Sequence, residues 1–168
     1  EPEPESWRIV SCAERHFARS VAYSALGQTE NARHELERMD EIAANLTDEW
    51  LVGNNSAIDV VAVARKMAQG ELAYREGRVD ESFALLREAV VLEESLSYDE
   101  PPGWMQPVRH ALGALLMAEG RYAAAEAVYR ADLERHPNNA WSLLGLQQSL
   151  RESGQVQRAA ELELQVQQ

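Results

Sequence analysis

Apolar residues recur along most of the chain at intervals of three and four, which is the spacing of one face of an α-helix. Short polar hinges separate these runs, and no segment alternates with period two. The pattern therefore predicts an all-α protein without a β-sheet. The expected helices cover residues 7–26, 30–46, 56–76, 80–97, 105–119, 122–135, 139–152 and 156–166.

Four glycines reveal a repeat within this pattern. Gly27, Gly77, Gly120 and Gly154 each follow one helical run and precede a hinge and a second helical run. Their separations are 50, 43 and 34 residues. A glycine that recurs at such a turn supplies the left-handed conformation that ends a helix. The chain is therefore expected to be an array of helix pairs.

The third pair carries a recognisable motif. Leu112-Gly113, Ala125, Tyr129 and Pro137 follow the pattern L-G, A, aromatic, P of the 34-residue tetratricopeptide repeat, although its leading Trp and its Tyr are missing. The chain therefore resembles the tetratricopeptide repeat family over nearly its whole length, and we expect a bacterial member. The resemblance implies a right-handed α-solenoid of antiparallel helix pairs in a single domain. Its repeats are expected near residues 13–46, 63–97, 106–138 and 140–168.

Two separations exceed the repeat period, which indicates insertions. They are expected near residues 47–56 and 98–105, between one repeat and the next, where added residues do not interrupt the stack. Glu163 stands where the repeat carries an aromatic residue, which predicts a C-terminal capping helix. No such cap is evident at the other end, so the chain is expected to be the C-terminal part of a longer array or to form a homodimer.

The resemblance also predicts which side chains line a concave groove. In this family the first helix of each pair contributes them from fixed positions. The partner-binding residues expected here are Phe17, Met67, Glu71, Tyr74, His110, Met117, Trp141, Leu144, Gln148 and Arg151. This mixture of aromatic, methionine and polar groups suits an extended peptide. Replacing Tyr74, His110 and Arg151 together is predicted to abolish partner binding without loss of helicity.

The stretch "YDEPPGWMQPVRH" (98–110) needs two explanations. Pro101, Pro102 and Gly103 end one helix, and Pro107 is expected in the first turn of the next, where its missing N–H costs little. The prolines are thus explained by their role in ending one helix and starting the next. Tyr98 and Trp104 are not explained in this way, and they either clamp the core or form the lip of a binding site.

The net charge of the chain limits which classes of partner are expected. Acidic residues outnumber basic ones 28 to 16, for a net charge of −12. Nucleic-acid binding requires a basic surface, so it is not expected. Apolar stretches such as "ALGALLMA" are too short to insert into a membrane. The expected partner is a protein or peptide that is neutral to basic. The compartment stays open, with the cytoplasm favoured over export.

Candidate chemistry is sparse. Cys12 and His16 are four residues apart and share a helical face, so with His110 and methionines 67, 105 and 117 they could form a copper-like site. The alternative is that His16 is a packed core residue. No phosphate-binding loop, nucleophile elbow or zinc-helix motif occurs. The sequence therefore predicts a non-catalytic interaction module without a cofactor, with a small-molecule or metal-binding protein as the alternative.

Overall fold

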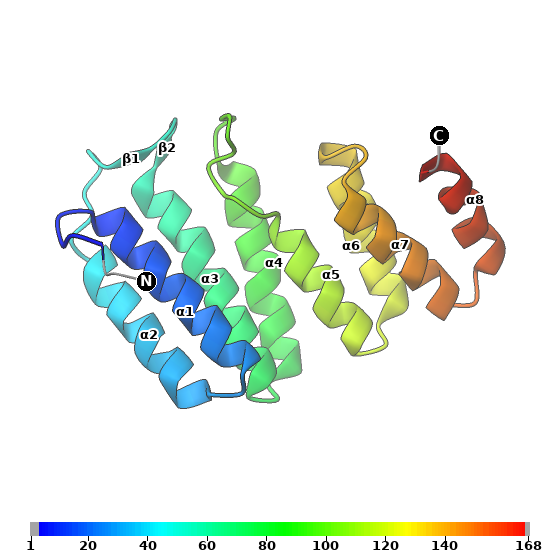
Figure 1. Ribbon diagram of the computed structural model, residues 1–168, viewed down its shortest axis with the longest axis horizontal. Coiled ribbons are helices and arrows are strands. Elements are labelled where there is room, and N and C mark those ends of the chain that lie inside the picture. Colours follow the sequence, from blue (N-terminus) through cyan, green and yellow to red (C-terminus); the bar gives the residue numbers. More distant parts are fainter. Residues whose placement is uncertain (1–3, 167–168) are drawn as a thin grey trace. The chain divides into compact units, whose positions relative to one another are not determined.

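The computed structural model describes the backbone of residues 4–166 and the side chains of residues 4–162. Every predicted helix is present in the described part, and its bounds lie within three residues of those expected. The prediction of an all-α helical-repeat fold is therefore confirmed (Figure 1). The helices are α1 (Ile9–Ala25), α2 (Thr29–Ala43), α3 (Ala57–Arg75), α4 (Val79–Ser95), α5 (Val108–Ala118), α6 (Tyr122–Arg135), α7 (Ala140–Glu152) and α8 (Val156–Val166).

Two local predictions were wrong. The first insertion contains a small antiparallel hairpin, in which β1 (Leu51–Val52) pairs with β2 (Asn55–Ser56). The hairpin forms because Gly53 adopts a positive φ of 57° in the two-residue turn. In addition, α5 begins only at Val108, so Pro107 precedes the helix as its N-cap instead of lying in its first turn.

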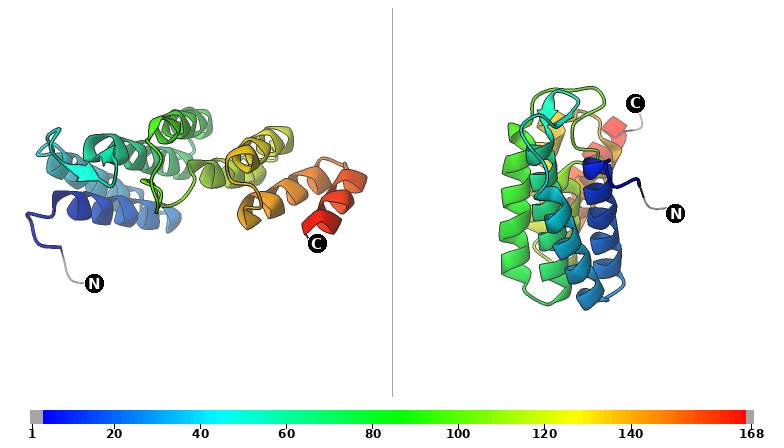
Figure 2. Two further views of the ribbon diagram at one scale, coloured as in Figure 1. Left: turned by 90° about the horizontal axis from the view of Figure 1, so that it is seen from above. Right: turned by 90° about the vertical axis from the view of Figure 1, so that its left-hand side faces the viewer.

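The chain divides into two compact units, residues 1–105 and residues 106–168. The expectation of a single domain stays a prediction. In unit 1, α1 packs against α2 and α3 packs against α4, and α1 and α3 lie side by side (Figures 1 and 2). Most of α3 is buried between its neighbours, including Val63, Ala64 and Ala68. Gly70 of α3 lets α4 approach closely, because a Cβ there would lie 2.7 Å from Cγ of Leu86.

Unit 2 is organised in the same way. Helix α5 packs against α6, α6 packs against α7, and α7 packs against α8. The phenol ring of Tyr129 fills the space between adjacent helix pairs, as predicted, and Gly113 and Gly145 lie against it. Ala125, one turn before Tyr129 in α6, is fully buried. Ala159 of α8 is fully buried. The side chain of Glu163, on which the predicted C-terminal cap depends, lies outside the described residues.

The four glycines end the first helix of each pair as the sequence predicted. Gly120 has a φ of 67°. The N–H of Arg121 after it donates to the carbonyl oxygen of Leu116 (2.9 Å), which satisfies a carbonyl group that the helix leaves free. The same bond recurs after Gly27, Gly77 and Gly154. This shared turn makes each helix fold back against the one before it.

Candidate functional site

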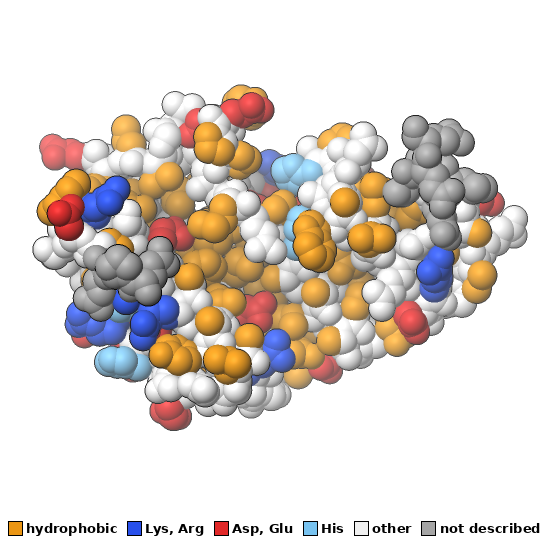
Figure 3. Space-filling view, viewed as in Figure 1, with side chains coloured by type: hydrophobic (Ala, Val, Ile, Leu, Met, Phe, Trp, Pro, Cys, Tyr) orange, Lys and Arg blue, Asp and Glu red, His pale blue; other side chains and the backbone are white. Residues whose placement is uncertain are grey.

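In unit 1, the predicted groove residues divide into buried and half-buried groups. Phe17 of α1 and Met67 of α3 are buried and belong to the core. Glu71 and Tyr74 of α3 are half-buried, and the guanidinium group of Arg75 lies 5.4 Å from the centre of the Tyr74 ring. On the face shown in Figure 3, hydrophobic side chains gather over α1 and α3 with charged side chains beside them.

Two carboxyl groups in unit 1 have unusual environments. Burial raises the pKa of Glu14 from 4.5 to about 7, and its Oε2 atom has no hydrogen-bond partner. Burial also raises the pKa of Glu71, although the charge of Arg75 opposes this shift. Glu14 lies one helical turn before Phe17. Because a buried carboxylate without a partner is costly, both groups favour the neutral form more than an exposed glutamate does.

In unit 2, the predicted groove residues of α7 form a continuous exposed face. Trp141 is 75% exposed and Leu144 is 61% exposed. Gln148 and Arg151 follow on the same side of the helix and are also exposed. Met117 of α5 is half-buried. The opposite side of α7 is buried through Leu146 and Leu150, so the exposed face does not contribute to the core.

His110 has a role that sequence reasoning missed. Its Nε2 atom lies 3.2 Å from Oδ2 of Asp132, and Ser142 Oγ donates to the same oxygen at 2.5 Å. Asp132 is fully buried, and its Oδ1 atom has no partner. The serine hydroxyl contacts the carboxylate and not the imidazole, so these residues do not form a nucleophile and base in contact. The cluster instead links α5, α6 and α7.

His16 takes part in a second, partly buried cluster, which joins α1 to α2 around the buried side chain of Glu35. Its Nδ1 atom lies 2.6 Å from Oε2 of Glu35, and Arg19 Nε donates to Oε1 at 2.7 Å. Burial alone would raise the pKa of Glu35, but the hydrogen bonds and charges of Arg19 and His16 together hold that pKa below its usual value. The arrangement fits the expectation of a packed core histidine.

The metal candidates are only partly brought together. Cys12 and His16 line one hollow of about 210 Å³ with Arg15 and Arg38. Within residues 4–162, no three His, Cys, Asp or Glu side chains are grouped as a metal site would require. Met67 is buried, whereas Met105 is exposed. Metal binding stays the untested alternative, which elemental analysis of the purified protein would decide.

The two insertions are joined to each other by hydrogen bonds at one end of unit 1. We call residues 96–105 the linking segment. Ser97 N–H donates to Asn55 Oδ1 (2.7 Å), and Asn55 Nδ2 donates back to the Ser97 carbonyl oxygen (3.2 Å). Asn54 N–H donates to Asp99 Oδ2 at 2.7 Å. Figure 2 shows the hairpin beside the linking segment, so the insertions form one local structure.

The two aromatic residues of the linking segment have different environments. Tyr98 is exposed, and its hydroxyl group donates to Glu100 Oε1 at 2.6 Å. Trp104 is only 4% exposed and packs edge-on against Phe17, with 5.2 Å between ring centres. Trp104 therefore clamps the segment onto α1. Ligand binding by either residue stays a prediction.

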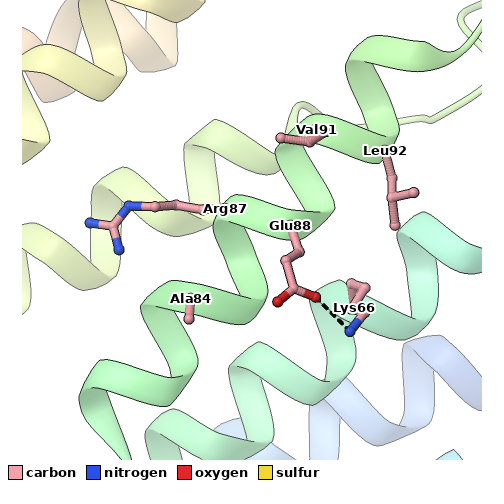
Figure 4. Close-up of a pocket in the computed structure, with 6 residues that line it drawn as sticks. All are labelled: Lys66, Ala84, Arg87, Glu88, Val91 and Leu92. Atoms are coloured by element: carbon pink, nitrogen blue, oxygen red, sulfur yellow. Dashed lines mark ion pairs between the residues drawn. The ribbon is translucent and has the colours of Figure 1, made fainter.

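Two further hollows lie in unit 1. One of about 440 Å³ is open to solvent beside α4, where Lys66 pairs with Glu88 at 2.6 Å and Val91 is exposed (Figure 4). None of the predicted groove residues lines it. The other, of about 480 Å³, follows α1 and is lined by Glu14 and by the exposed Ala18 and Ala22. In the described part of the chain, none of the helices is both long and apolar enough to span a bilayer.

Comparison with solved structures relates this fold to known repeat proteins. The chain is similar to two crystal structures of nearly identical TPR-like repeats from a Podosopora anserina protein assigned to the kinesin light chains. One of these is a single-residue variant, with 24% identity and a TM-score of 0.61, and the other has 22% identity and a TM-score of 0.60. Each comparison covers 94% of this chain and 74% of the other chain. No family model matches the sequence, and no curated protein matches it.

Proposed function

We propose that the chain is a non-catalytic protein-binding module whose repeats hold a peptide or partner protein through their first helices. Its TPR-like repeat fold is of a kind that generally mediates protein–protein interaction. In unit 1 the first helices are α1 and α3, and in unit 2 they are α5 and α7.

The observation that carries this proposal is the exposed face of α7. Large apolar side chains that lie singly on a surface need no explanation, but Trp141 and Leu144 are adjacent on one helical face. Tryptophan is among the residues that most often dominate the energy of an interface. Gln148 and Arg151 extend the same face with groups that can donate hydrogen bonds to a partner backbone.

The chemistry of the partner follows from charge. The net charge of −12 favours encounter with a neutral or basic partner. On α7 itself, a partner that presents an apolar side chain toward Trp141 and a hydrogen-bond acceptor toward Gln148 would match the exposed groups. We therefore propose a neutral to basic peptide segment with at least one apolar anchor.

A paired comparison of variants tests the proposal. Trp141→Ala with Leu144→Ala removes the apolar part of the α7 face. The matched control is Trp7→Ala with Leu26→Ala, because these residues are 66% and 69% exposed and lie outside the predicted groove. We expect a pulldown with the wild-type chain and with the control to recover the same partner, and the α7 variant to lose it. Equal recovery by all three proteins would contradict the proposal.

A further inference from the structure

The side chain of Trp104 occupies a position on unit 1 that the proposed function assigns to a partner. Phe17, on which it packs, is one of the predicted groove residues of α1. The indole ring approaches Phe17 edge-on, with an interplanar angle of 69°, which is a favourable geometry for two aromatic rings. Phe17 is thus the floor of a subsite that fits an aromatic side chain and that the chain itself fills.

The hydrogen bonds that fix the linking segment to the hairpin lie on the N-terminal side of Trp104. The backbone of the linking segment is fixed at Ser97 and Asp99 by hydrogen bonds to the hairpin. Gly103 also lies against the Asn55 side chain, where a Cβ would come within 2.7 Å of Nδ2. Trp104 itself lies beyond the hydrogen-bonded anchors, and its Nε1–H has no hydrogen-bond partner although the side chain is buried. A buried donor without an acceptor weakens the docked state, because the same group is hydrogen-bonded to water when the ring is released.

The surroundings of the linking segment allow release. Its residues Glu100, Pro101 and Pro102 are exposed, as are Met105 and Gln106 after the tryptophan. The segment forms no helix or strand between α4 and α5. The ring can therefore leave Phe17 by a change in the few residues around it, while the anchors at Ser97 and Asp99 stay in place.

We propose that Phe17 marks an aromatic-binding subsite on unit 1 that Trp104 occupies in cis, so that a partner segment with an aromatic side chain binds there by displacing it. This inference rests on the proposed function and adds the chemistry of one anchor of the partner. It also gives the linking segment the role of a built-in competitor, which lowers the apparent affinity for any partner until Trp104 is released.

Release of Trp104 can be measured in the unmodified protein. The sequence has four tryptophans, so their indole N–H resonances can be assigned by single Trp→Phe variants. We expect the indole N–H of Trp104 to have a protection factor against deuterium exchange at least about tenfold lower than those of the slowest backbone amides of α3, through local opening, each rate being divided by the intrinsic rate of its own group. A protection factor equal to those of the amides would mean that the ring leaves only on global unfolding, and would overturn the inference.

Binding in trans provides the second test. In one variant, residues 98–105 are replaced by a Gly/Ser linker of the same length, and a labelled peptide of residues 97–106 serves as the probe. Fluorescence anisotropy is expected to show binding to this variant and at least about tenfold weaker binding to the wild type. The same peptide with Trp104→Ala should not bind, and Phe17→Ala in the linker variant should abolish binding.

The outcomes separate this inference from the proposed function. If the linker variant folds but does not bind the peptide, or binds it no more tightly than the wild type does, the aromatic subsite does not exist. Should the linker variant not fold, the exchange rate of the Trp104 indole decides alone. Neither experiment involves the α7 face. Failure of the aromatic subsite would therefore leave the proposed function standing, because that proposal is tested separately by partner capture with the Trp141 and Leu144 variant.

Discussion

The ring of Tyr129 lies against the backbone of Gly145, so closely that a Cβ atom on Gly145 would come within 2.3 Å of the tyrosine Cζ. Gly113 borders the same ring, where a Cβ would come within 2.5 Å. The ring is therefore confined between α5 and α7 and cannot move aside. This contact joins the two helix pairs of unit 2.

Gly145→Ala is predicted to destabilise the protein by about 1 kcal/mol, the net of two opposing effects. Overpacking a confined site costs about 1–3 kcal/mol, and the better helix propensity of alanine returns only about 1 kcal/mol. Chemical denaturation measures the change. Gln148→Ala, an exposed substitution on the same helix, should alter the free energy of unfolding by less than about 0.5 kcal/mol. A Gly145→Ala protein as stable as the wild type would show that the ring is not confined.

Glu14→Gln is predicted to remove part of the pH dependence of stability. The pKa of Glu14 is about 7 in the folded protein and 4.5 without burial, so the folded chain binds an extra proton between these values. The free energy of unfolding therefore falls as the pH rises from 4.5 to 7, by up to about 3 kcal/mol from this group.

Denaturation of both proteins across this pH range provides the measurement. We expect Glu14→Gln to be more stable than the wild type at pH 8 and nearly equal to it at pH 4. Ser11→Ala, an uncharged change at an exposed position of α1, should leave the slope unaltered. Parallel curves for Glu14→Gln and the wild type would mean that the carboxyl group is hydrated in solution.

Glu35→Gln should have the opposite pH dependence. Arg19 and His16 hold the pKa of Glu35 below its usual value, so its contribution to stability is present above its unfolded pKa and is lost as the pH falls through the lowered one. At pH 7 the substitution is expected to cost about 1–3 kcal/mol, because a neutral amide pairs poorly with His16 and Arg19 at this partly buried site. Below about pH 4 the difference from the wild type should shrink; a constant difference would argue against ionisation of Glu35.

His110→Ala is predicted to lower stability by about 1–3 kcal/mol, because it removes a partner from the buried Asp132 carboxylate. This effect complicates the use of His110 as a binding-site substitution alongside Tyr74 and Arg151. Thermal unfolding checks it, with Arg151→Ala as the exposed control in the same unit. An unchanged unfolding midpoint would mean that the contact between His110 and Asp132 does not persist in solution.

Much of the fold was predictable because its signals are local. Helical periodicity located every helix, and the glycines at the hinges located the turns within each pair. The small hairpin was not predicted, because strands of two residues are too short to show alternation. The hydrogen bonds between the two insertions were not predictable either, since Asn55 and Ser97 are 42 residues apart and neither belongs to a motif.

The candidate site was only partly predictable for a similar reason. The family register predicted that Trp141 and Leu144 of α7 line a groove, and the structure shows that both side chains are exposed. The register does not indicate which polar side chains meet across helices. The contacts of Asp132 with His110 and Ser142 were therefore not predicted. His110 was expected only to line a groove. Whether the exposed face binds a partner stays a prediction.

The most direct test of the central proposal uses the tryptophans as reporters. Peptides that bind the wild-type chain can be selected from an array of neutral to basic sequences and then titrated into ¹⁵N-labelled protein. The indole N–H resonance of Trp141 is predicted to shift on binding, while that of Trp7, which is 66% exposed but lies outside the proposed surface, stays in place. A bound peptide that leaves the Trp141 resonance unmoved would contradict the account.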